Sequence, residues 1–221
     1  MMDVWQSIPN AVLAGPPAGS TEDYVGFRRL VSLDIPMVNP SGGVDYYVDG
    51  NTNNTVRDGA SWATAYATLT PAMAASHANI ALSANRAWAR RNRIFCIGDN
   101  ITENLTTLAQ KTDIIGVGQA DGQQPGCRLE GNHVIAGTFP GCRFINMQFI
   151  ASGAGATIMT LVTGQGAAQF IGCRFLVGAT CVVGLKATAV TDLVVQDCEF
   201  DGTWVTGGFS KTPNMRGMLG P

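Results

Sequence analysis

A phrase of eight residues that occurs three times is the feature that most constrains how this chain of 221 residues can fold. The copies read FINMQFIA (144–151), FIGCRFLV (170–177) and VQDCEFDG (195–202), so they begin 26 and 25 residues apart. Self-similarity at a period of about 20 to 50 residues indicates stacked repeats, each too small to bury its own apolar face. We therefore expect structural units that pile up on one another.

Alignment of the three copies gives three columns that are apolar throughout. They are Phe144, Phe170 and Val195; Met147, Cys173 and Cys198; and Phe149, Phe175 and Phe200. The first two columns are three residues apart, a spacing that strand alternation cannot place on one face. Between them stand Asn146, Gly172 and Asp197, which are of the residue types that most readily enter the left-handed backbone region. Each unit is thus predicted to be a strand, a one-residue corner and a second strand.

Stacked corners of this kind predict an all-β fold, a short parallel β-helix. Residues 158–162 and 181–185 supply a further apolar strand between successive phrases, without a helical crossover. Residues 114–117 repeat the corner pattern 30 residues before Phe144, with the extra length looped out at 121–126. We expect four or five coils, which would form a cylinder about 20 to 24 Å tall.

Composition limits the partners that the chain can have. Charged residues make up only 14% of it, against about 25% in an average soluble domain. The formal net charge of −2 provides no electrostatic attraction to nucleic acid or to an anionic membrane. No apolar run is long enough to cross a bilayer, and the first residues lack the charged and apolar regions of a secretory signal. We therefore expect synthesis in a cytosol, no membrane insertion and no nucleic-acid partner.

The six cysteines are interpreted as buried free thiols. They are Cys96, Cys127, Cys142, Cys173, Cys181 and Cys198. No pair has the close spacing of a zinc or redox motif, and unpaired cysteine behaves as a small hydrophobe. The sequence therefore indicates a reducing compartment during folding, and no cofactor is expected.

Residues 1–43 contain repeated proline and glycine and cannot form a core of their own. We interpret them as an extended N-terminal arm for attachment or assembly, anchored on a partner by Trp5, Tyr24, Phe27 and Leu30. The alternative is a tail that is disordered or packs on itself, since terminal segments are poorly ordered unless something holds them.

Residues 44–92 are predicted to form a first strand, a polar loop and a capping helix. Residues 46–48 read as the strand and 49–59 as the loop. Thr70 and Pro71 are suited to the N-cap and first position of an Ala-rich helix, which would close the open end of the cylinder. The β-helix itself is expected over 93–203.

Residues 204–221 read as a C-terminal cap or tail, because a β-helix that simply stopped would expose unpaired backbone groups. Trp204, Val205 and Phe209 are candidates to cover that end. Met215, Met218 and Leu219 could instead dock on a neighbour, since Met-rich ends adapt to partner grooves.

The segment from 45 to 118 also carries a specific resemblance. The run YVD, an Asn/Gly loop, SWATAYATL and a helix, followed by RIFCIGDNITENLTTLAQKTDIIGVG, resembles the N-terminal module and first coil of right-handed parallel β-helix proteins of the pectin-lyase-like superfamily. The resemblance covers residues 45–203, and its motifs are structural rather than catalytic. The superfamily includes polysaccharide lyases, hydrolases and esterases, as well as bacteriophage tailspikes and other virion proteins.

The catalytic patterns that this resemblance implies are missing from the chain. There is neither an acidic calcium cluster with a catalytic Arg on the outer face nor a histidine between two glycines. We interpret His77 and His133 as structural, because no partner for acid–base work lies nearby in the sequence.

Glu199 and Asp201 are the remaining catalytic candidates, since both should point outward on either side of Phe200, as paired carboxylates do in glycosidases. Asp192 and Asp197 complete this acidic group. The alternative is a structural role, in which Asp197 forms a corner and Glu199 pairs with Arg174 one coil away. An enzyme of this kind would be a polysaccharide lyase or glycoside hydrolase, but we expect a protein that is not an enzyme.

Two weaker patterns concern metal and partner binding. Asp49, Asn51 and Asn53 imitate the start of a calcium-binding loop, but the turn glycine and the bidentate glutamate of such a loop are missing. The alternative is an ordinary turn. A basic cluster around Trp88 reads as a solvated helix face or as a surface for an acidic partner. It comprises Arg86, Arg90, Arg91 and Arg93.

Short length and low charge favour an assembly role over catalysis. About 110 residues of coil leave little room for the long saccharide groove of an enzyme. We expect a structural protein of a bacteriophage virion, a capsid-decorating or tail-attached spike or fibre component that forms a homotrimer and docks on capsid or tail proteins through its arm. The alternative is a tailspike-like protein that binds or cleaves host surface polysaccharide. A cell-surface adhesin is a third possibility, which the missing secretion signal disfavours.

Overall fold

The computed structural model describes residues 42–82, 90–118, 127–137, 140–153, 156–163, 168–176, 181–188, 190, 192–201, 204–211 and 217–219. The chain divides into two units, 1–38 and 39–221, and all of these residues belong to the second. The proposed arm anchors Trp5, Tyr24, Phe27 and Leu30 therefore lie outside the described residues.

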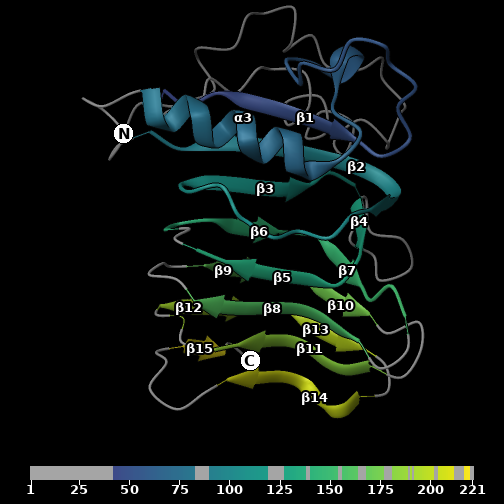
Figure 1. Cartoon of the computed structure of the whole chain (residues 1–221), viewed down its shortest axis with the longest axis vertical. Coiled ribbons are helices and arrows are strands. Elements are labelled where there is room, and N and C mark those ends of the chain that lie inside the picture. The colour runs from purple at the N-terminus through teal and green to yellow at the C-terminus, as the bar shows by residue number, and fades with distance from the viewer. Residues whose placement is uncertain are drawn as a thin grey trace, which may run out of the picture. The chain divides into compact units, whose positions relative to one another are not determined.

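The described residues form an almost entirely β structure in which every strand pairing is parallel (Figure 1). The strands are β1 (Asp45–Asp49), β2 (Asn92–Thr102), β3 (Thr112–Gly116), β4 (Cys127–Glu130), β5 (His133–Ala136), β6 (Arg143–Ile145), β7 (Gln148–Ile150), β8 (Thr157–Thr163), β9 (Gln169–Ile171), β10 (Arg174–Leu176), β11 (Cys181–Ala187), β12 (Leu193–Gln196), β13 (Glu199–Asp201), β14 (Trp204–Lys211) and β15 (Gly217–Leu219). One short 3-10 turn, η2 (Trp62–Thr64), and one helix, α3 (Leu69–Leu82), accompany them.

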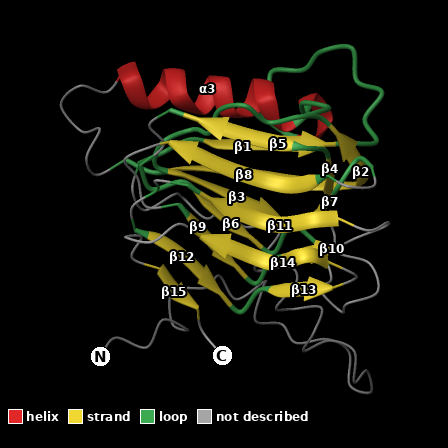
Figure 2. Ribbon diagram, turned by 60° about the horizontal axis from the view of Figure 1, so that its bottom comes forward, coloured by secondary structure: helices red, strands yellow, loops and turns green. Residues whose placement is uncertain are grey.

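These strands make three ladders that the chain visits in turn. Ladder A runs β1-β2-β3-β6-β9-β12-β15, ladder B runs β2-β4-β7-β10-β13, and ladder C runs β5-β8-β11-β14. The first half of β2 belongs to ladder A and its second half to ladder B. From β3 onward the order A, B, C repeats, and each such set of one strand from every ladder is called a rung. Figure 2 shows the strands of ladder C, β5, β8, β11 and β14, following one another. The result is a β-helix-like winding of parallel strands.

The register confirms two of the three apolar columns that the repeated phrase predicted. Phe144 pairs with Phe170 and Phe170 with Val195 in ladder A, while Phe149, Phe175 and Phe200 follow one another in ladder B. Four of these rings, those of Phe144, Phe149, Phe170 and Phe175, have no exposed surface. The stacked neighbours lie 4.8 to 5.2 Å apart between ring centroids. The interior is therefore built around two stacks of aromatic rings.

The corner column is confirmed as well. Asn146, Gly172 and Asp197 have φ angles of 53°, 58° and 51°, all in the left-handed region. Asn146 adds a hydrogen bond, because its Nδ2 donates to the carbonyl of Gly116 one rung away at 2.8 Å. Each corner turns the chain from ladder A into ladder B and returns the next side chain to the interior.

Replacing Gly172 by alanine is expected to lower the free energy of unfolding by about 1–2 kcal/mol, because only the strain of a left-handed alanine is added. Open space surrounds the position, so that a Cβ meets no other atom. Asparagine should cost less, since it enters this region more readily. Gly153→Ala is the control: its surroundings are equally open and its backbone is not left-handed. Urea denaturation followed by circular dichroism measures both, and equal effects at the two positions would contradict the corner.

Helix α3 lies at one end of the stack, beside β1 and β2 (Figure 1). Leu69, Ala72, Met73, Ser76 and Ile80 form its buried face. The helix begins at Leu69, so Thr70 and Pro71 lie inside the first turn instead of at the predicted N-cap and first positions.

Glu103 holds the N-terminus of this helix from a loop far along the chain. Its carboxylate accepts hydrogen bonds from the backbone N–H groups of Leu69 (2.6 Å) and Thr70 (3.1 Å) and from the Thr70 hydroxyl (2.6 Å). A negative charge is favourable there because the helix N-terminus is positive and its first N–H groups lack partners within the helix. Glu103 thereby fastens the capping helix to the first rung.

The ladders continue beyond residue 203, where the repeats predicted the end of the β-helix. Strand β14 pairs with β11 in ladder C, and β15 pairs with β12 in ladder A. Only the backbone is described for these two strands, which contain Trp204, Val205, Phe209, Met218 and Leu219. Met215 lies outside the described residues. The predicted tail therefore adds two strands to the stack.

Candidate functional site

The outer face of ladder A carries two regular columns of side chains. Ile94, Ile114 and Phe144 are fully buried, and successive residues of a strand point to opposite faces, so the residues on either side of them point outward. The charged column consists of Asp45, Arg93, Asp113 and Arg143 and ends at Gln169; the apolar column consists of Tyr47, Phe95, Ile115, Ile145 and Ile171. Every member of each column is in register with the next.

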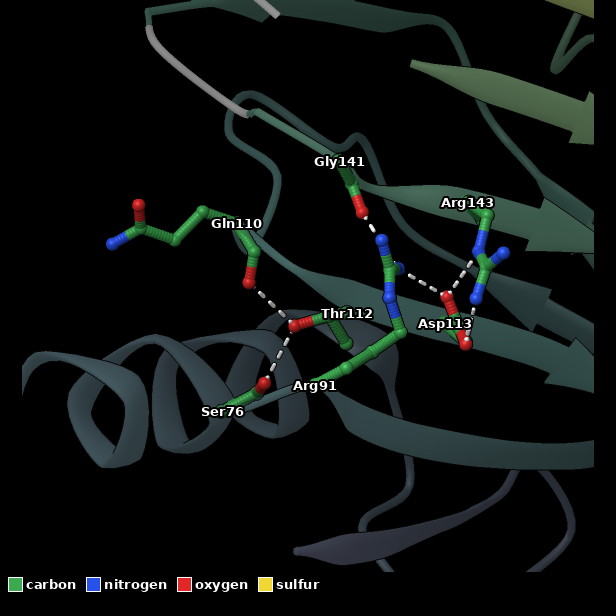
Figure 3. Close-up of polar contacts among 7 residues, drawn as sticks. All are labelled: Ser76, Arg91, Gln110, Thr112, Asp113, Gly141 and Arg143. Atoms are coloured by element: carbon green, nitrogen blue, oxygen red, sulfur yellow. Dashed lines mark hydrogen bonds and ion pairs between the residues drawn. The ribbon is translucent and has the colours of Figure 1, made fainter. Parts of the chain in front are cut away.

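Asp113 is the centre of the charged column (Figure 3). Arg143 donates two hydrogen bonds to its carboxylate, each 2.6 Å long, and Arg91 donates a third at 2.5 Å. The Arg91 guanidinium also donates to the carbonyl oxygen of Gly141 at 2.9 Å. The Asp113 side chain is only 9% exposed. Hydrogen bonding to this carboxylate raises the pKa of Arg143, so both charges are stabilised by each other.

A second ion pair continues the column toward the helix. Arg93 donates to both carboxylate oxygens of Asp45, at 2.8 and 2.6 Å. These hydrogen bonds raise the pKa of Arg93. The charged column thus alternates in sign along the face, and its four charged members satisfy one another.

A buried hydrogen-bond chain fixes the first rungs behind this face. The Asn92 amide donates to the Ser76 hydroxyl (3.0 Å), which lies 2.7 Å from the Thr112 hydroxyl, and Thr112 in turn donates to the carbonyl of Gln110 (2.9 Å). Ser76, Asn92 and Thr112 have no exposed surface. Figure 3 shows the part of this chain that leads from Ser76 of helix α3 to Thr112, on the strand that carries Asp113, and on to Gln110. The position of Asp113 is therefore tied to the helix.

The apolar column runs beside the charged column as a stripe of large side chains. Its members are all partly buried, unlike the enclosed residues between the two columns. The Tyr47 and Phe95 rings stack at 5.8 Å, and Trp62, which is 37% exposed, packs edge-on against Tyr47 at 4.8 Å. The Arg93 guanidinium lies 5.4 Å from the centre of the Phe95 ring and joins the two columns. The face is therefore apolar along one line and electrically balanced along the other.

His133 is an interior residue of β5. Its Nδ1 accepts a hydrogen bond from the backbone N–H of Leu105 at 3.1 Å, and its ring meets that of Phe149 edge-on at 6.2 Å. Its Nε2 has no partner among the described residues. Burial lowers the pKa of His133 to about 4, because the charged imidazolium would lose its hydration. His77, in contrast, is exposed on helix α3.

Acidification is expected to destabilise the fold through His133. Its pKa is depressed in the folded state, so below an unfolded value of about 6.5 the unfolded chain binds the proton that the folded chain rejects. The contribution of neutral His133 to stability is complete above that pH and falls as the pH approaches 4. Between about pH 7 and about pH 4.5 the loss due to His133 should be about 2–3 kcal/mol.

The His133→Asn variant tests this expectation, since the asparagine oxygen can still accept from Leu105 while the titrating group is gone. Urea denaturation at both pH values should show a smaller pH dependence than in the unchanged protein. His77→Ala serves as the control and should retain the full dependence. An unchanged dependence in His133→Asn would show that the carboxylates alone account for it.

Glu199 and Asp201 lie close to each other on the outer side of ladder B, and Arg174 engages both. Arg174 is in register with Glu199, as the repeat predicted, and its Nε lies 3.2 Å from the Glu199 carboxylate. Its NH2 group donates to Asp201 at 2.5 Å. Asp192 and Asp197 are both backbone corners with left-handed φ angles. The acidic group is therefore organised by a structural arginine and by corners.

The calcium-loop candidates form a turn. The Asp49 carboxylate accepts a hydrogen bond from the backbone N–H of Asn51 at 2.9 Å, and the N–H of Thr52 donates to the Asp49 carbonyl at 3.1 Å. Asn53 is exposed. Among the residues that the structure describes, no three His, Cys, Asp or Glu side chains gather in a way that could hold a metal ion.

The structure describes only part of the basic cluster. Arg91 and Arg93 belong to the ion pairs of ladder A, whereas Arg86 and Trp88 lie outside the described residues. In the sequence these arginines stand among other basic residues, so the carboxylates that strand pairing brings next to them could not be recognised.

Comparison with known proteins finds no matching family model, no matching curated protein and no matching solved structure. Helices of the length and hydropathy needed to span a bilayer are not found within the described ranges. Function must therefore be inferred from the arrangement of side chains.

Proposed function

We propose that the protein is a non-enzymatic structural protein of a bacteriophage virion, a capsid-decorating or tail-attached spike or fibre component. In this proposal it is a right-handed parallel β-helix of the pectin-lyase-like type with four or five coils. The observation that carries the proposal is the outer face of ladder A, where an apolar column of five in-register residues runs beside a self-neutralised charged column.

Such a face suits packing between copies of the same chain. The apolar column offers surface that gains free energy when water is removed from it. The paired charges next to it remain satisfied when a second copy approaches, so that neither partner has to bury an unpaired charge. A cyclic homotrimer would direct this face of every copy toward the common axis.

The charged groups around Glu199 and Asp201 support a structural role more than a catalytic one. The two candidate carboxylates, Glu199 and Asp201, both form ion pairs with Arg174, an arrangement that a structural role explains. A glycosidase of the usual kind needs one carboxyl group that is protonated near neutral pH. We therefore assign Glu199 and Asp201 a structural role in the proposal.

Attachment to the particle is tested by antibody labelling. An antibody against the purified protein should label phage particles from the source culture at the capsid or tail. A chain without residues 1–43 should keep its β circular dichroism spectrum but fail to bind particles that lack the protein. Binding that survives this deletion would refute docking through the arm.

Incubation with bacterial surface polysaccharides tests the non-enzymatic part of the proposal. No new reducing ends or unsaturated sugars should appear. Sugar release by the intact chain that is lost in Glu199→Gln or Asp201→Asn, with the fold unchanged, would overturn the proposal in favour of a polysaccharide-cleaving tailspike.

A further inference from the structure

Two cysteine pairs meet across neighbouring rungs, and they differ in their access to solvent. Cys173 and Cys198 precede the paired residues Arg174 and Glu199 of β10 and β13. Cys96 and Cys127 form the second pair. Burial and, after it, the neighbouring thiol raise the pKa of Cys173, beside Cys198, and of Cys96, beside Cys127, well above the usual range. Both members of the second pair have no exposed surface, whereas Cys198 is only partly buried.

We propose that Cys173 and Cys198 are a redox-active dithiol that forms a disulfide between adjacent rungs by exchange with a small-molecule disulfide such as oxidised glutathione. This inference does not rest on the proposed function.

Backbone geometry brings the two residues to a distance that a disulfide can bridge. The N–H of Glu199 donates to the carbonyl of Cys173, and the N–H of Gly172 donates to the carbonyl of Gln196, both at 2.9 Å. Hydrogen bonds on both sides of the cysteines hold the strands at the ordinary spacing of about 4.8 Å. Disulfides join residues whose Cα atoms are about 4.4–6.8 Å apart.

The side chains also point in the same direction. The Sγ of Cys173 lies 3.4 Å from the carbonyl oxygen of Phe144, and the Sγ of Cys198 lies 3.4 Å from that of Phe170. Each sulfur is thus directed toward the rung that precedes its own, which places Cys198 Sγ on the side of Cys173.

The environments of the two thiols assign different roles to them. The adjacent Cys173 thiol lowers the pKa of Cys198, while burial raises the pKa of Cys173 well above its usual range. A partly exposed thiol with a lowered pKa is the better nucleophile near neutral pH. Cys198 is therefore the attacking residue, and Cys173, which is 1% exposed, is the resolving residue.

The reaction proceeds in two exchange steps. The Cys198 thiolate attacks one sulfur of oxidised glutathione, forms a mixed disulfide and releases one glutathione thiolate. Cys173 then loses its proton, attacks the Cys198 sulfur and releases the second glutathione. Two protein thiols are oxidised to one disulfide, and one oxidised glutathione is reduced to two molecules of glutathione.

Peptide mapping of the folded protein tests the proposal. The protein is incubated with oxidised glutathione, denatured, alkylated with iodoacetamide and digested with trypsin without reductant. Cleavage after Lys and Arg places each cysteine of both pairs in a separate peptide. The peptides are 144–174 for Cys173, 187–211 for Cys198, 94–111 for Cys96 and 112–128 for Cys127.

The expected product is a linked pair of peptides 144–174 and 187–211 that has lost two hydrogen atoms and is separated again by dithiothreitol. Peptides 94–111 and 112–128 should remain unlinked, since both of their cysteines are enclosed. In Cys173→Ser a glutathione adduct should persist on Cys198, and in Cys198→Ser no adduct should form on Cys173.

Four results would overturn the proposal. They are a Cys198 that stays fully alkylated, a glutathione adduct that persists on Cys198 although Cys173 is present, a link from Cys198 to Cys181, and a link between Cys96 and Cys127 of equal yield, which would mean that the whole fold opens. Circular dichroism of both serine variants verifies that they remain folded.

Discussion

Replacing Phe149 by alanine is expected to lower the free energy of unfolding by about 3–5 kcal/mol. The ring is fully buried and lies 5.1 Å from Phe175, 5.3 Å from Phe144 and 6.1 Å from Phe170. Its removal leaves a cavity where both aromatic stacks meet. A loss of this size is a large fraction of the total stability of about 5–15 kcal/mol that most proteins have.

Phe200→Ala is the matched control for this prediction. Phe200 belongs to the same column and stacks on Phe175 at 4.8 Å, but it is only partly buried. Truncation there should cost about 1–2 kcal/mol, because less surface is removed from the interior. Urea denaturation at neutral pH measures both variants. Equal losses, or a loss below about 1 kcal/mol for Phe149→Ala, would contradict an interior organised around the aromatic stacks.

Replacing Asp113 by asparagine is expected to cost about 2–3 kcal/mol. Removal of one member of a buried ion pair costs about 3–5 kcal/mol, because the other charge stays behind without compensation. Here Arg91 and Arg143 are 30% and 31% exposed, so water can hydrate them in part and the loss is smaller. The asparagine oxygen can still accept one of the three hydrogen bonds.

Asp45→Asn provides the comparison, since it removes a carboxylate from the same column. The Asp45 side chain is 23% exposed and pairs with Arg93. Its replacement should cost about 1 kcal/mol, near the upper end for accessible ion pairs. Thermal and urea unfolding measure the loss of stability in both variants. A larger loss for Asp45→Asn than for Asp113→Asn would show that Asp113 is not the centre of the column.

The interior of the fold could be predicted from the sequence because its repeats use residue types that favour one structural position. Phenylalanine recurs in the stacked positions, and asparagine, glycine and aspartate recur at the left-handed corners. The pairing of Arg174 with Glu199 followed from the same alignment. These features depend only on residues within one unit and its copy in the next.

A second set of corners includes one residue, Lys111, that gave no signal in the sequence. Lys111, Gly141 and Asp192 are left-handed where the chain enters β3, β6 and β12. Lysine seldom adopts this conformation, so Lys111 could not be recognised as a corner from the sequence. Tertiary context, including the hydrogen bond from its N–H to the carbonyl of Pro140 at 2.8 Å, holds it there.

The outer face of ladder A could not be predicted because loops of unequal length separate its members. Asp45 and Arg93 are 48 residues apart, whereas Asp113 and Arg143 are 30 apart. Without a constant period, neither the charged nor the apolar column stands out in the sequence. The same reason conceals Glu103, whose partner Leu69 lies 34 residues away.

Light scattering coupled to size exclusion tests the central claim, that the outer face of ladder A joins copies of this chain. The intact protein should elute with three times the chain mass. Ile145→Asp, in the middle of the apolar column, should elute as a monomer with an unchanged circular dichroism spectrum, because a charge would have to be buried between copies. Val134→Asp, on the outer side of ladder C where Val134 is 52% exposed, should remain a trimer. A monomeric intact protein, or an Ile145→Asp variant that stays trimeric, would contradict the claim.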